Sequence, residues 1–357
     1  MTPRLVYERW TDPAAGDVLA ASDVDLDVVH LDLADPEAAW ALLQGAHGYQ
    51  VATRTDVSQF ADGDQWLVGE ELIRRCPDLL AVCSAGAGYD VIDVEACTRA
   101  GIAVCNNSGP GAEAVAEHAL GFMLDLAKNV TRADRALRAG SLGHRLSLQG
   151  SQLSGKTLGV IGMGAIGGRL VELCAPFAME VLVFDPYLTP AAARARGVTV
   201  TDLPDLLARA DFVQVTCPLT DQTRGLIGKR EFATMKATAY FISTARGPIH
   251  DEQALYSALT EGRIAGAGLD VFHTEPPTAD EPLLALDSVV ATPHLAGITR
   301  EAARDIAVAT AQQWTQLLSG AHPPRLINPG VWPAFTERFE ALFGTPVAPR
   351  HDTITTS

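Results

Sequence analysis

Residues 154–185 read SGKTLGVIGMGAIGGRLVELCAPFAMEVLVFD, and the order of their parts decides the fold. The apolar run 157–161 predicts a strand, after which Gly162, Gly164 and Gly167 form a G-x-G-x-x-G turn. A helical pattern and a second apolar run follow. In a dinucleotide-binding unit the first glycine makes the turn, the second admits the pyrophosphate, and the third lets helix and strand pack closely. The free N–H groups at the start of the helix then face the phosphates.

Asp185 closes the second apolar run, 181–184, and indicates which dinucleotide binds. A carboxylate at this position accepts hydrogen bonds from the adenosine ribose hydroxyls and repels a 2′-phosphate. Residues 186–189 contain no Arg or Lys. These observations favour NAD over NADP. The alternative, a glycine turn in another kind of α/β unit, is weakened by the flanking strands and the acidic residue.

The composition sets limits on the class of protein. The chain has 357 residues, of which 47% are hydrophobic, and this suffices for two domains with packed cores. The net charge of −16 argues against a nucleic acid or an anionic membrane surface as partner. None of the six cysteines lies in C-x-x-C spacing, which indicates buried, reduced thiols. With no signal peptide and no membrane-spanning run, we expect a cytoplasmic protein, and we expect no metal.

Short apolar runs alternate with helical patterns, which predicts parallel sheets with crossover helices. In the first hundred residues the predicted strands are 28–33, 49–53, 79–84 and 102–105, and the predicted helices are 36–43, 70–76 and 91–100. After the glycine turn the predicted strands are 212–216, 240–243, 267–271 and 289–291, with helices at 203–209 and 253–260. One long helix is expected at 113–139 and a final one at 300–318. Six or seven strands from residue 158 onward complete a doubly wound sheet.

A second G-x-G follows the predicted strand 79–84, at Gly86 and Gly88. It lacks the third glycine, so it is a poor dinucleotide turn. Its backbone N–H groups can instead face a small anion. An ordinary turn at the end of a strand explains the spacing equally well.

Three charged or titratable residues follow predicted strands of the nucleotide-binding part of the chain: Arg246, Glu275 and His294. Ligands of open α/β sheets bind at the carboxyl ends of the strands, so all three point to one region. Hydride transfer to a ketone leaves negative charge on oxygen, and imidazole is a suitable proton donor near neutral pH. A neighbouring carboxylate orients the imidazole, while a guanidinium holds a substrate carboxylate in two-point fashion. The set is complete for reduction of a 2-keto acid.

The sequence resembles the D-isomer-specific 2-hydroxyacid dehydrogenases, the group that includes 3-phosphoglycerate dehydrogenase. The resemblance is clearest over residues 79–332. The matching stretches are SAGAGYDVID, EAVAEHALGFML, LSGKTLGVIGMGAIGG, FVQVTCPLTDQTRGLI, FISTARGPIHDEQAL, GRIAGAGLDVFHTEPP and ATPHLAG.

The resemblance implies an α/β fold with two Rossmann-like, doubly wound parallel-sheet domains and a cleft between them. The substrate-binding domain would be discontinuous, formed by 1–108 and 297–334. Residues 109–296 would form the NAD-binding domain, and 335–357 a C-terminal tail. Members of the family are usually homodimers built on the NAD-binding domain.

The resemblance also implies roles for individual residues. Arg246 would bind the substrate carboxylate and carbonyl, and Glu275 would pair with His294, the general acid–base. The substrate carboxylate would also meet the N–H groups of Ala87 and Gly88 and the side chain of Arg54, which matches a position where some members place a substrate-binding Arg or Ser. Cofactor-binding residues would be Gly162, Gly164, Ala165, Ile166, Gly167, Asp185, Thr216, Cys217, Pro218, Thr223, Thr244, Ala245, Arg246, Asp270, His294 and Gly297, with Asp270 at the nicotinamide amide.

The chain departs from the family pattern at three places. The turn 106–111 reads NNSGPG, where many members have an Asn-Thr-Pro-Gly-type turn. His250 stands where the family usually has an apolar residue, and we interpret it as structural. No regulatory domain is expected after Trp332.

The expected function is an NAD-dependent D-2-hydroxyacid dehydrogenase acting on a small 2-hydroxy or 2-keto acid. Oxidation of 3-phosphoglycerate is a narrower alternative. An NAD-sensing interaction protein, similar to the C-terminal-binding-protein corepressors, is an alternative from another class, since those proteins share the fold and retain the same three residues.

Overall fold

The computed structural model describes residues 1–52, 63–141 and 143–347. The chain divides into two compact units. The first unit comprises Met1–Gly111 and Arg300–Ser357, and the second comprises Ala112–Thr299. The boundaries between the units lie after residues 111 and 299, three residues after the expected boundaries at 108 and 296.

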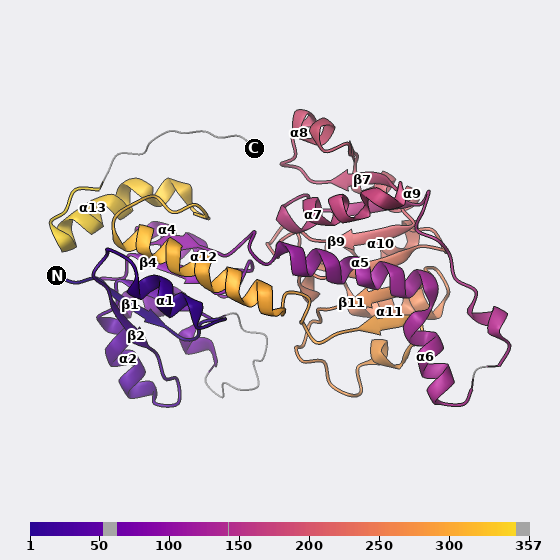
Figure 1. Cartoon of the computed structure of the whole chain (residues 1–357), viewed down its shortest axis with the longest axis horizontal. Coiled ribbons are helices and arrows are strands. Elements are labelled where there is room, and N and C mark those ends of the chain that lie inside the picture. Colours follow the sequence, from indigo (N-terminus) through magenta and orange to yellow (C-terminus); the bar gives the residue numbers. More distant parts are fainter. Residues whose placement is uncertain (53–62, 142, 348–357) are drawn as a thin grey trace. The chain divides into compact units, whose positions relative to one another are not determined.

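The second unit is built on a seven-stranded parallel sheet in the order β12-β11-β10-β9-β6-β7-β8 (Figure 1). Its strands are β6 (Thr157–Ile161), β7 (Glu180–Phe184), β8 (Thr199–Val200), β9 (Phe212–Val215), β10 (Tyr240–Ser243), β11 (Gly266–Leu269) and β12 (Val289–Ala291). The chain starts in the middle at β6, runs outward to β8, and then returns to β9 on the other side of β6. The strand order therefore reverses between β6 and β9, and ligands of such sheets bind at this point.

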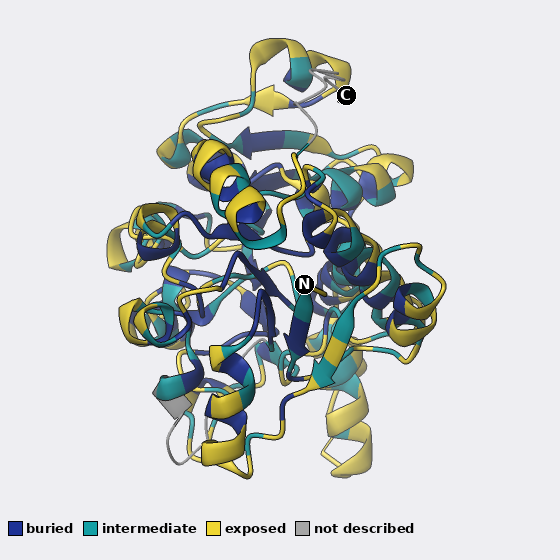
Figure 2. Cartoon of the chain, turned by 90° about the vertical axis from the view of Figure 1, so that its left-hand side faces the viewer, coloured by how far each residue is buried: buried dark blue, intermediate teal, exposed yellow. Residues whose placement is uncertain are grey.

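Helices cover both faces of this sheet and bury a separate core on each. One core holds Leu206, Phe232, Phe241 and Leu255, and the other holds Phe122, Leu170, Phe212 and Ile242. The helices are α5 (Ala112–Lys128), α6 (Val130–Arg138), α7 (Ala165–Cys174), α8 (Pro190–Ala195), α9 (Leu203–Arg209), α10 (Lys229–Thr234) and α11 (Glu252–Thr260). In Figure 2 the inner strands are dark blue, buried ribbons, whereas the edge strand β8 and the outer helix faces are exposed. The sheet is therefore doubly wound, as predicted.

The first unit has a five-stranded parallel sheet in the order β2-β1-β3-β4-β5. Its strands are β1 (Arg4–Tyr7), β2 (Asp27–His30), β3 (Gly48–Val51), β4 (Ala81–Ser84) and β5 (Ala103–Cys105). Its helices are α1 (Ala14–Ala20), α2 (Pro36–Gln44), α3 (Glu70–Arg75), α4 (Val94–Arg99), α12 (Arg300–Leu318) and α13 (Trp332–Phe343). Short 3-10 turns of both units lie at Gly63–Trp66, Arg145–Leu148, Ala175–Phe177, Gly247–Ile249, Pro282–Ala285 and Pro329–Val331.

The last helices of the chain complete the core of the first unit. Trp314 of α12 is fully buried, and its indole N–H donates to the Gln50 side chain at 2.7 Å. A Cβ added to Gly48 would lie 2.6 Å from the Trp314 ring, so the ring occupies the space above that glycine. Phe335 and Phe339 of α13 join the same core. The segment 332–343 is thus a packed helix of the first unit, although the sequence assigns the residues from 335 onward to a C-terminal tail.

Polar side chains cap the first turn of several helices. Asp251 accepts a hydrogen bond from the backbone N–H of Ala254, and Asp202 accepts one from Asp205. Such caps satisfy N–H groups that have no partner inside the helix. They fix where α11 and α9 begin.

The predicted single helix 113–139 is wrong, because the chain forms α5 and α6 with a break at Asn129. Asn129 adopts a left-handed conformation with φ of 54°, which asparagine tolerates better than most residues. Asp125 stabilises the break, since its carboxylate accepts hydrogen bonds from the backbone N–H and the hydroxyl of Thr131. Strands β1 and β8 were also not predicted. Among the residues that the structure describes, no helix is long and apolar enough to cross a membrane.

Candidate active site

The glycine turn between β6 and α7 has the geometry that a pyrophosphate requires. Gly162 has φ of 96°, and a Cβ there would lie 2.7 Å from the backbone nitrogen of Cys217. A Cβ on Gly167 would lie 2.4 Å from the carbonyl oxygen of Gly162. Nothing lies within 4 Å of a Cβ built on Gly164. The first and third glycines are therefore required by close packing, while the second faces open space beside the helix start at Ala165.

Asp185 lies at the end of β7 and is tied to the glycine turn. One carboxylate oxygen accepts the backbone N–H of Met163 at 2.7 Å, and the other accepts that of Tyr187 at 2.8 Å. The carboxylate is thus held beside the turn, at the position where a ribose-binding residue belongs. The glycine turn and this carboxylate together fit a dinucleotide.

The segment after β9 borders the same reversal point in the strand order. The hydroxyl of Thr216 donates to the carbonyl of Gly162 at 2.6 Å, which joins this segment to the glycine turn. Burial raises the pKa of the Cys217 thiol to about 11, so the thiol stays protonated near neutral pH. Farther along, the Thr223 hydroxyl donates to the carbonyl of Pro218 at 2.7 Å and closes the loop on itself.

Arg246, Glu275 and His294 follow three neighbouring strands, β10, β11 and β12. In the register of these strands Ser243 pairs with Leu269, and Leu269 pairs with Ala291. The three strands therefore end level with one another, and the segments that carry the three residues leave the same edge of the sheet.

Glu275 and His294 form a direct pair. Nδ1 of His294 lies 2.6 Å from Oε2 of Glu275, and the two side chains are 24% and 15% exposed. A carboxylate accepts hydrogen bonds, so Nδ1 carries the hydrogen. The other carboxylate oxygen accepts the backbone N–H of Phe272 at 3.0 Å. Among the described residues Nε2 of His294 has no hydrogen-bond partner, which leaves it for a ligand.

The loop that carries His294 is held by Asp270, which is 1% exposed. One oxygen of Asp270 accepts the Thr292 hydroxyl at 2.6 Å and the N–H of Leu295 at 2.9 Å, and the other accepts the N–H of Ala296 at 2.9 Å. The backbone carbonyl of Asp270 accepts the N–H of His294 at 2.8 Å. These bonds stabilise the left-handed backbone of His294, whose φ is 51°. The sequence predicts that Asp270 contacts the nicotinamide amide. In the structure both of its carboxylate oxygens already accept hydrogen bonds from the protein.

His118 on α5 extends this network and was missed by the sequence reasoning. Its Nε2 lies 3.0 Å from the Thr292 hydroxyl oxygen. The Thr292 hydrogen goes to Asp270, so the His118 Nε2–H donates. Burial lowers the pKa of His118, although the nearby Asp270 carboxylate acts to raise it. The lowered pKa favours the neutral ring. The only signal in the sequence was its position within the stretch EAVAEHALGFML.

Arg246 lies next to the segment that leads to Glu275. Its guanidinium donates to the carbonyl of Ala245 at 2.7 Å, and the side chain is half-buried. A Cβ on Gly247 would lie 2.1 Å from the carbonyl carbon of Phe272. The backbone after Arg246 therefore packs directly on the backbone before Glu275, and this contact requires glycine.

The other predicted residues lie in ordered turns. The Thr244 hydroxyl accepts a hydrogen bond from buried Gln214 at 2.9 Å. In the first unit, Asn106 donates to the carbonyl of Ala87 at 2.7 Å, and the Ser84 hydroxyl donates to that of Gly88. The NNSGPG turn thus supports the Gly86–Gly88 loop. Arg54 lies outside the described residues.

Comparison with known proteins agrees with this geometry. Residues 120–296 match the family model described as D-isomer specific 2-hydroxyacid dehydrogenase, NAD binding domain. The chain is 38% identical over 264 residues to a glyoxylate reductase of Korarchaeum cryptofilum, which covers 73% of this chain and 80% of that protein. The chain belongs to the D-isomer-specific 2-hydroxyacid dehydrogenase family.

Two further relatives show how far the similarity reaches. The chain is 40% identical over 271 residues to D-3-phosphoglycerate dehydrogenase of Archaeoglobus fulgidus, covering 76% of this chain and 51% of the relative. It therefore spans about half the length of the phosphoglycerate dehydrogenases it matches. The solved structure of D-lactate dehydrogenase from Aquifex aeolicus, complexed with NAD and lactic acid, superposes with a TM-score of 0.74 at 27% identity, covering 89% of this chain and 96% of that one.

Proposed function

We propose that the protein is an NAD-dependent D-2-hydroxyacid dehydrogenase that interconverts a small 2-keto acid and its 2-hydroxy acid. The observation that carries the proposal is the 2.6 Å pair of Glu275 and His294, on a sheet whose glycine turn fits NAD. A histidine oriented by a carboxylate is the proton donor that carbonyl reduction needs.

Each residue has a defined task in this proposal. When bound, the reduced nicotinamide supplies a hydride to the carbonyl carbon. Nε2–H of His294 gives its proton to the carbonyl oxygen, and Glu275 holds the ring through Nδ1. Arg246 binds the substrate carboxylate and polarises the carbonyl, since a guanidinium forms strong paired hydrogen bonds with carboxylates. The reverse reaction uses neutral His294 as the base.

Other residues would fix the cofactor and the substrate. Asp185 would accept the ribose hydroxyls, which favours NAD over NADP because a 2′-phosphate meets a carboxylate there. Exposed Ala87 and half-buried Gly88 would offer N–H groups to the substrate carboxylate. Arg54 would bind the same carboxylate.

The direct test is NADH oxidation with glyoxylate, hydroxypyruvate, pyruvate and longer 2-keto acids, each repeated with NADPH. We expect turnover with at least one acid and a preference for NADH. His294→Gln is the matched control, because it keeps a polar side chain but cannot act as an acid. Absence of turnover on every acid, while NADH binds by fluorescence titration, would contradict the proposal.

Two alternatives have distinct signatures. The similarity to D-3-phosphoglycerate dehydrogenase favours 3-phosphoglycerate as a substrate, which is tested by NAD reduction with that compound. An NAD-sensing interaction protein would bind NADH without turnover and keep its partner in His294→Ala. An enzyme loses turnover in the same variant.

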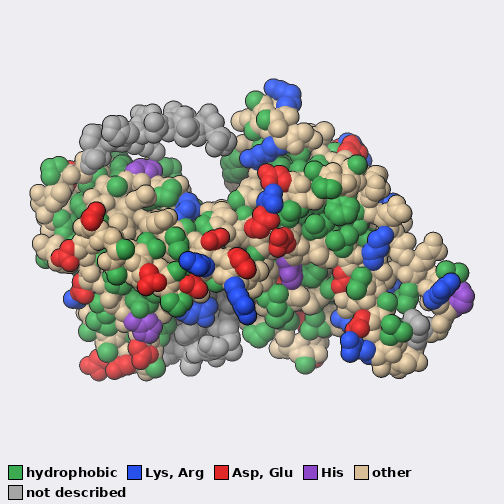
Figure 3. All heavy atoms as spheres, in the orientation of Figure 1, with side chains coloured by type: hydrophobic (Ala, Val, Ile, Leu, Met, Phe, Trp, Pro, Cys, Tyr) green, Lys and Arg blue, Asp and Glu red, His purple; other side chains and the backbone are tan. Residues whose placement is uncertain are grey.

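We also propose that two copies associate through the NAD-binding unit and that the protein works in the cytoplasm with its six cysteines reduced. The support for association is α6, which buries none of its residues, and exposed Val130, Leu137 and Leu146 at and beyond it. Figures 1 and 3 show this segment projecting from the second unit. Light scattering should find a dimer, and Leu137→Asp with Leu146→Asp should yield monomers. A monomeric parent protein would overturn this.

A further inference from the structure

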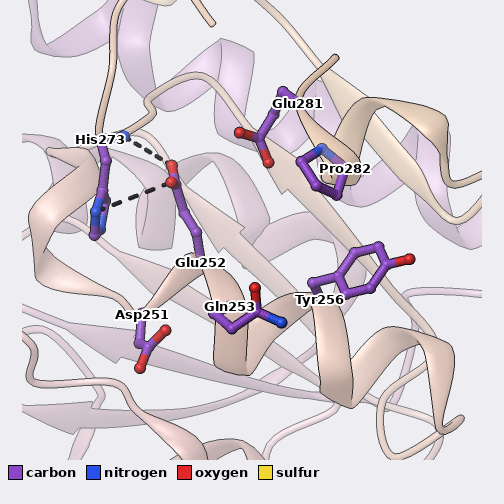
Figure 4. A pocket seen from close by; sticks show the side chains of 7 residues that line it. All are labelled: Asp251, Glu252, Gln253, Tyr256, His273, Glu281 and Pro282. Atoms are coloured by element: carbon purple, nitrogen blue, oxygen red, sulfur yellow. Dashed lines mark hydrogen bonds and ion pairs between the residues drawn. The ribbon is translucent and has the colours of Figure 1, made fainter. Parts of the chain in front are cut away.

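A second glutamate–histidine pair lies on the second unit, beside a pocket of about 270 Å³ at the start of α11 (Figure 4). The pair consists of Glu252, in the first turn of α11, and His273, which follows β11. Neither residue has a task in the chemistry proposed above. Their contacts lead to the segment that carries Glu275.

Glu252 contacts both the backbone and the ring of His273. One carboxylate oxygen accepts the backbone N–H of His273 at 2.7 Å, and the other lies 3.9 Å from Nδ1 of its ring. The Glu252 side chain is only 18% exposed. A hydrogen bond from an amide to a partly buried carboxylate is among the stronger ones in proteins. The contact therefore restrains the backbone at His273.

The far side of the His273 ring is fixed as well. Its Nε2 lies 2.7 Å from the backbone carbonyl of His250. A carbonyl only accepts, so Nε2 carries a hydrogen and donates it. The His250 ring is buried against Phe241, with ring centroids 5.3 Å apart. The ring of His273 thus joins its own segment to a rigid part of the core.

Two consecutive amides are held by two different carboxylates. The N–H of Phe272 donates to Glu275, and the next N–H, of His273, donates to Glu252. Gly247 packs against the 272–273 peptide unit. The Phe272 N–H belongs to the preceding peptide, which is joined to this one at the Phe272 Cα. A displacement of the backbone at this point would therefore shift the Phe272 N–H and misdirect the Glu275 carboxylate that it orients.

We propose that Glu252 and His273 are positioning residues that act through Glu275, by fixing the 272–273 peptide so that Glu275 stays aimed at Nδ1 of His294. The inference rests on the proposed dehydrogenase function for its kinetic consequences. The geometry it concerns, the Glu275–His294 hydrogen bond, exists whether or not turnover occurs.

The kinetic test uses Glu252→Ala and Glu252→Gln. Loss of the carboxylate should lower kcat about tenfold, a part of the 10²–10⁴ that a positioned acid supplies, and leave the KM for NADH unchanged. Glu252→Gln keeps an oxygen that accepts the His273 N–H and should restore most of kcat. Glu261→Ala is the matched control, because Glu261 ends the same helix and pairs only on the surface with Arg263 among the described residues.

The mutant cycle with Glu275→Gln separates positioning from general damage. If Glu252 acts through Glu275, Glu252→Ala has almost no further effect on kcat in the Glu275→Gln background. An equal loss in both backgrounds, or no loss in the parent, would overturn the inference.

A readout independent of turnover is the low-field proton NMR signal of His294 Nδ1–H, assigned by its absence in His294→Gln. This signal should broaden or disappear in Glu252→Ala and persist in Glu252→Gln and Glu261→Ala. An unchanged signal in Glu252→Ala overturns the inference. If the parent protein turns over no acid but the signal still responds, the proposed function fails and the positioning inference stands.

Discussion

The second unit contains two glutamate–histidine pairs, and they differ in how the imidazole is engaged. In the Glu275–His294 pair the ring meets its carboxylate at 2.6 Å through Nδ1, and Nε2 has no partner among the described residues. In the Glu252–His273 pair the carboxylate lies 3.9 Å from Nδ1, while Nε2 is bonded to the His250 carbonyl at 2.7 Å. Nε2 of His294 is therefore left for a ligand, whereas Nε2 of His273 takes part in a hydrogen bond within the fold.

This difference shows that residue types alone do not identify a proton donor. Both pairs lie near the same sheet edge and have similar composition. What distinguishes them is whether a ring nitrogen remains for a reacting atom once the ring is oriented. The comparison can be tested by changing each pair in turn.

The largest effect is expected from matched substitutions of the two histidines. His294→Gln should lower kcat about 10³-fold, because it removes the proposed proton donor. His273→Gln should lower kcat less than about tenfold, since the glutamine amide can still donate to the His250 carbonyl. Steady-state kinetics with the best 2-keto acid measures both. Equal losses in the two variants would remove the distinction between the pairs.

A smaller effect is expected when the carboxylate of the first pair is neutralised. Glu275→Gln should lower kcat about 10²-fold, because the imidazole loses its ionic partner but remains in place. The KM for NADH should stay unchanged, since the glycine turn is not altered. A raised KM for NADH with unchanged kcat would assign Glu275 to cofactor binding instead.

His250 provides a test of stability rather than rate. Burial lowers the pKa of its ring to about 3, below the ordinary value of 6.5. The unfolded chain therefore binds a proton between these values that the folded chain does not, and stability falls as pH decreases below about 6.5. At pH 5 this costs ~2 kcal/mol relative to pH 7.

Replacement of the ring should remove that cost. In His250→Leu the loss of stability between pH 7 and pH 5 should be smaller by ~2 kcal/mol, measured by urea unfolding. The His250 carbonyl that anchors His273 is backbone and remains, so kcat at pH 7 should change little. An identical pH dependence in both proteins would show that His250 is not a buried neutral residue.

The smallest effect is expected at Thr292. Thr292→Val removes the hydroxyl that links His118 to Asp270 and should cost about 1 to 2 kcal/mol of stability, because two hydrogen bonds are lost. The loop of His294 keeps its backbone bonds to Asp270, so kcat should fall only a few-fold. A loss as large as that of Glu275→Gln would mean that the hydroxyl, not the backbone bonds, orients His294.

Local patterns in the sequence predicted the parts of the fold that depend on local physics. The three glycines of the turn each have the constraint expected from their spacing, and both parallel sheets follow from the alternation of strands and helices. The break at Asn129 was not predicted, because a capping contact between Asp125 and Thr131 overrides the helical periodicity. Strand β8 has two residues, too few to show a pattern, whereas β1 has four, as many as β9 and β10, and was overlooked.

Within the candidate site, the residues at the strand ends could be predicted from the sequence. The residues that hold them in place through hydrogen bonds could not. His118 and Asp270 meet across 152 positions of sequence through the Thr292 hydroxyl. Glu252 and His273 meet only because α11 starts beside the end of β11. Contacts of this kind depend on tertiary packing, and no spacing within one segment predicts them.

The place of Trp314 has a consequence for synthesis of the chain. Strand β3 leaves the ribosome long before α12 is synthesised. Until then the sheet of the first unit has no Trp314 side chain packed over Gly48. At 5–20 residues per second, the 266 residues from Gly48 to Trp314 take about 13–53 s to translate. Through that interval the nascent N-terminal half presents an open apolar face, so this protein should depend on ribosome-associated chaperones more than its compact second unit alone would.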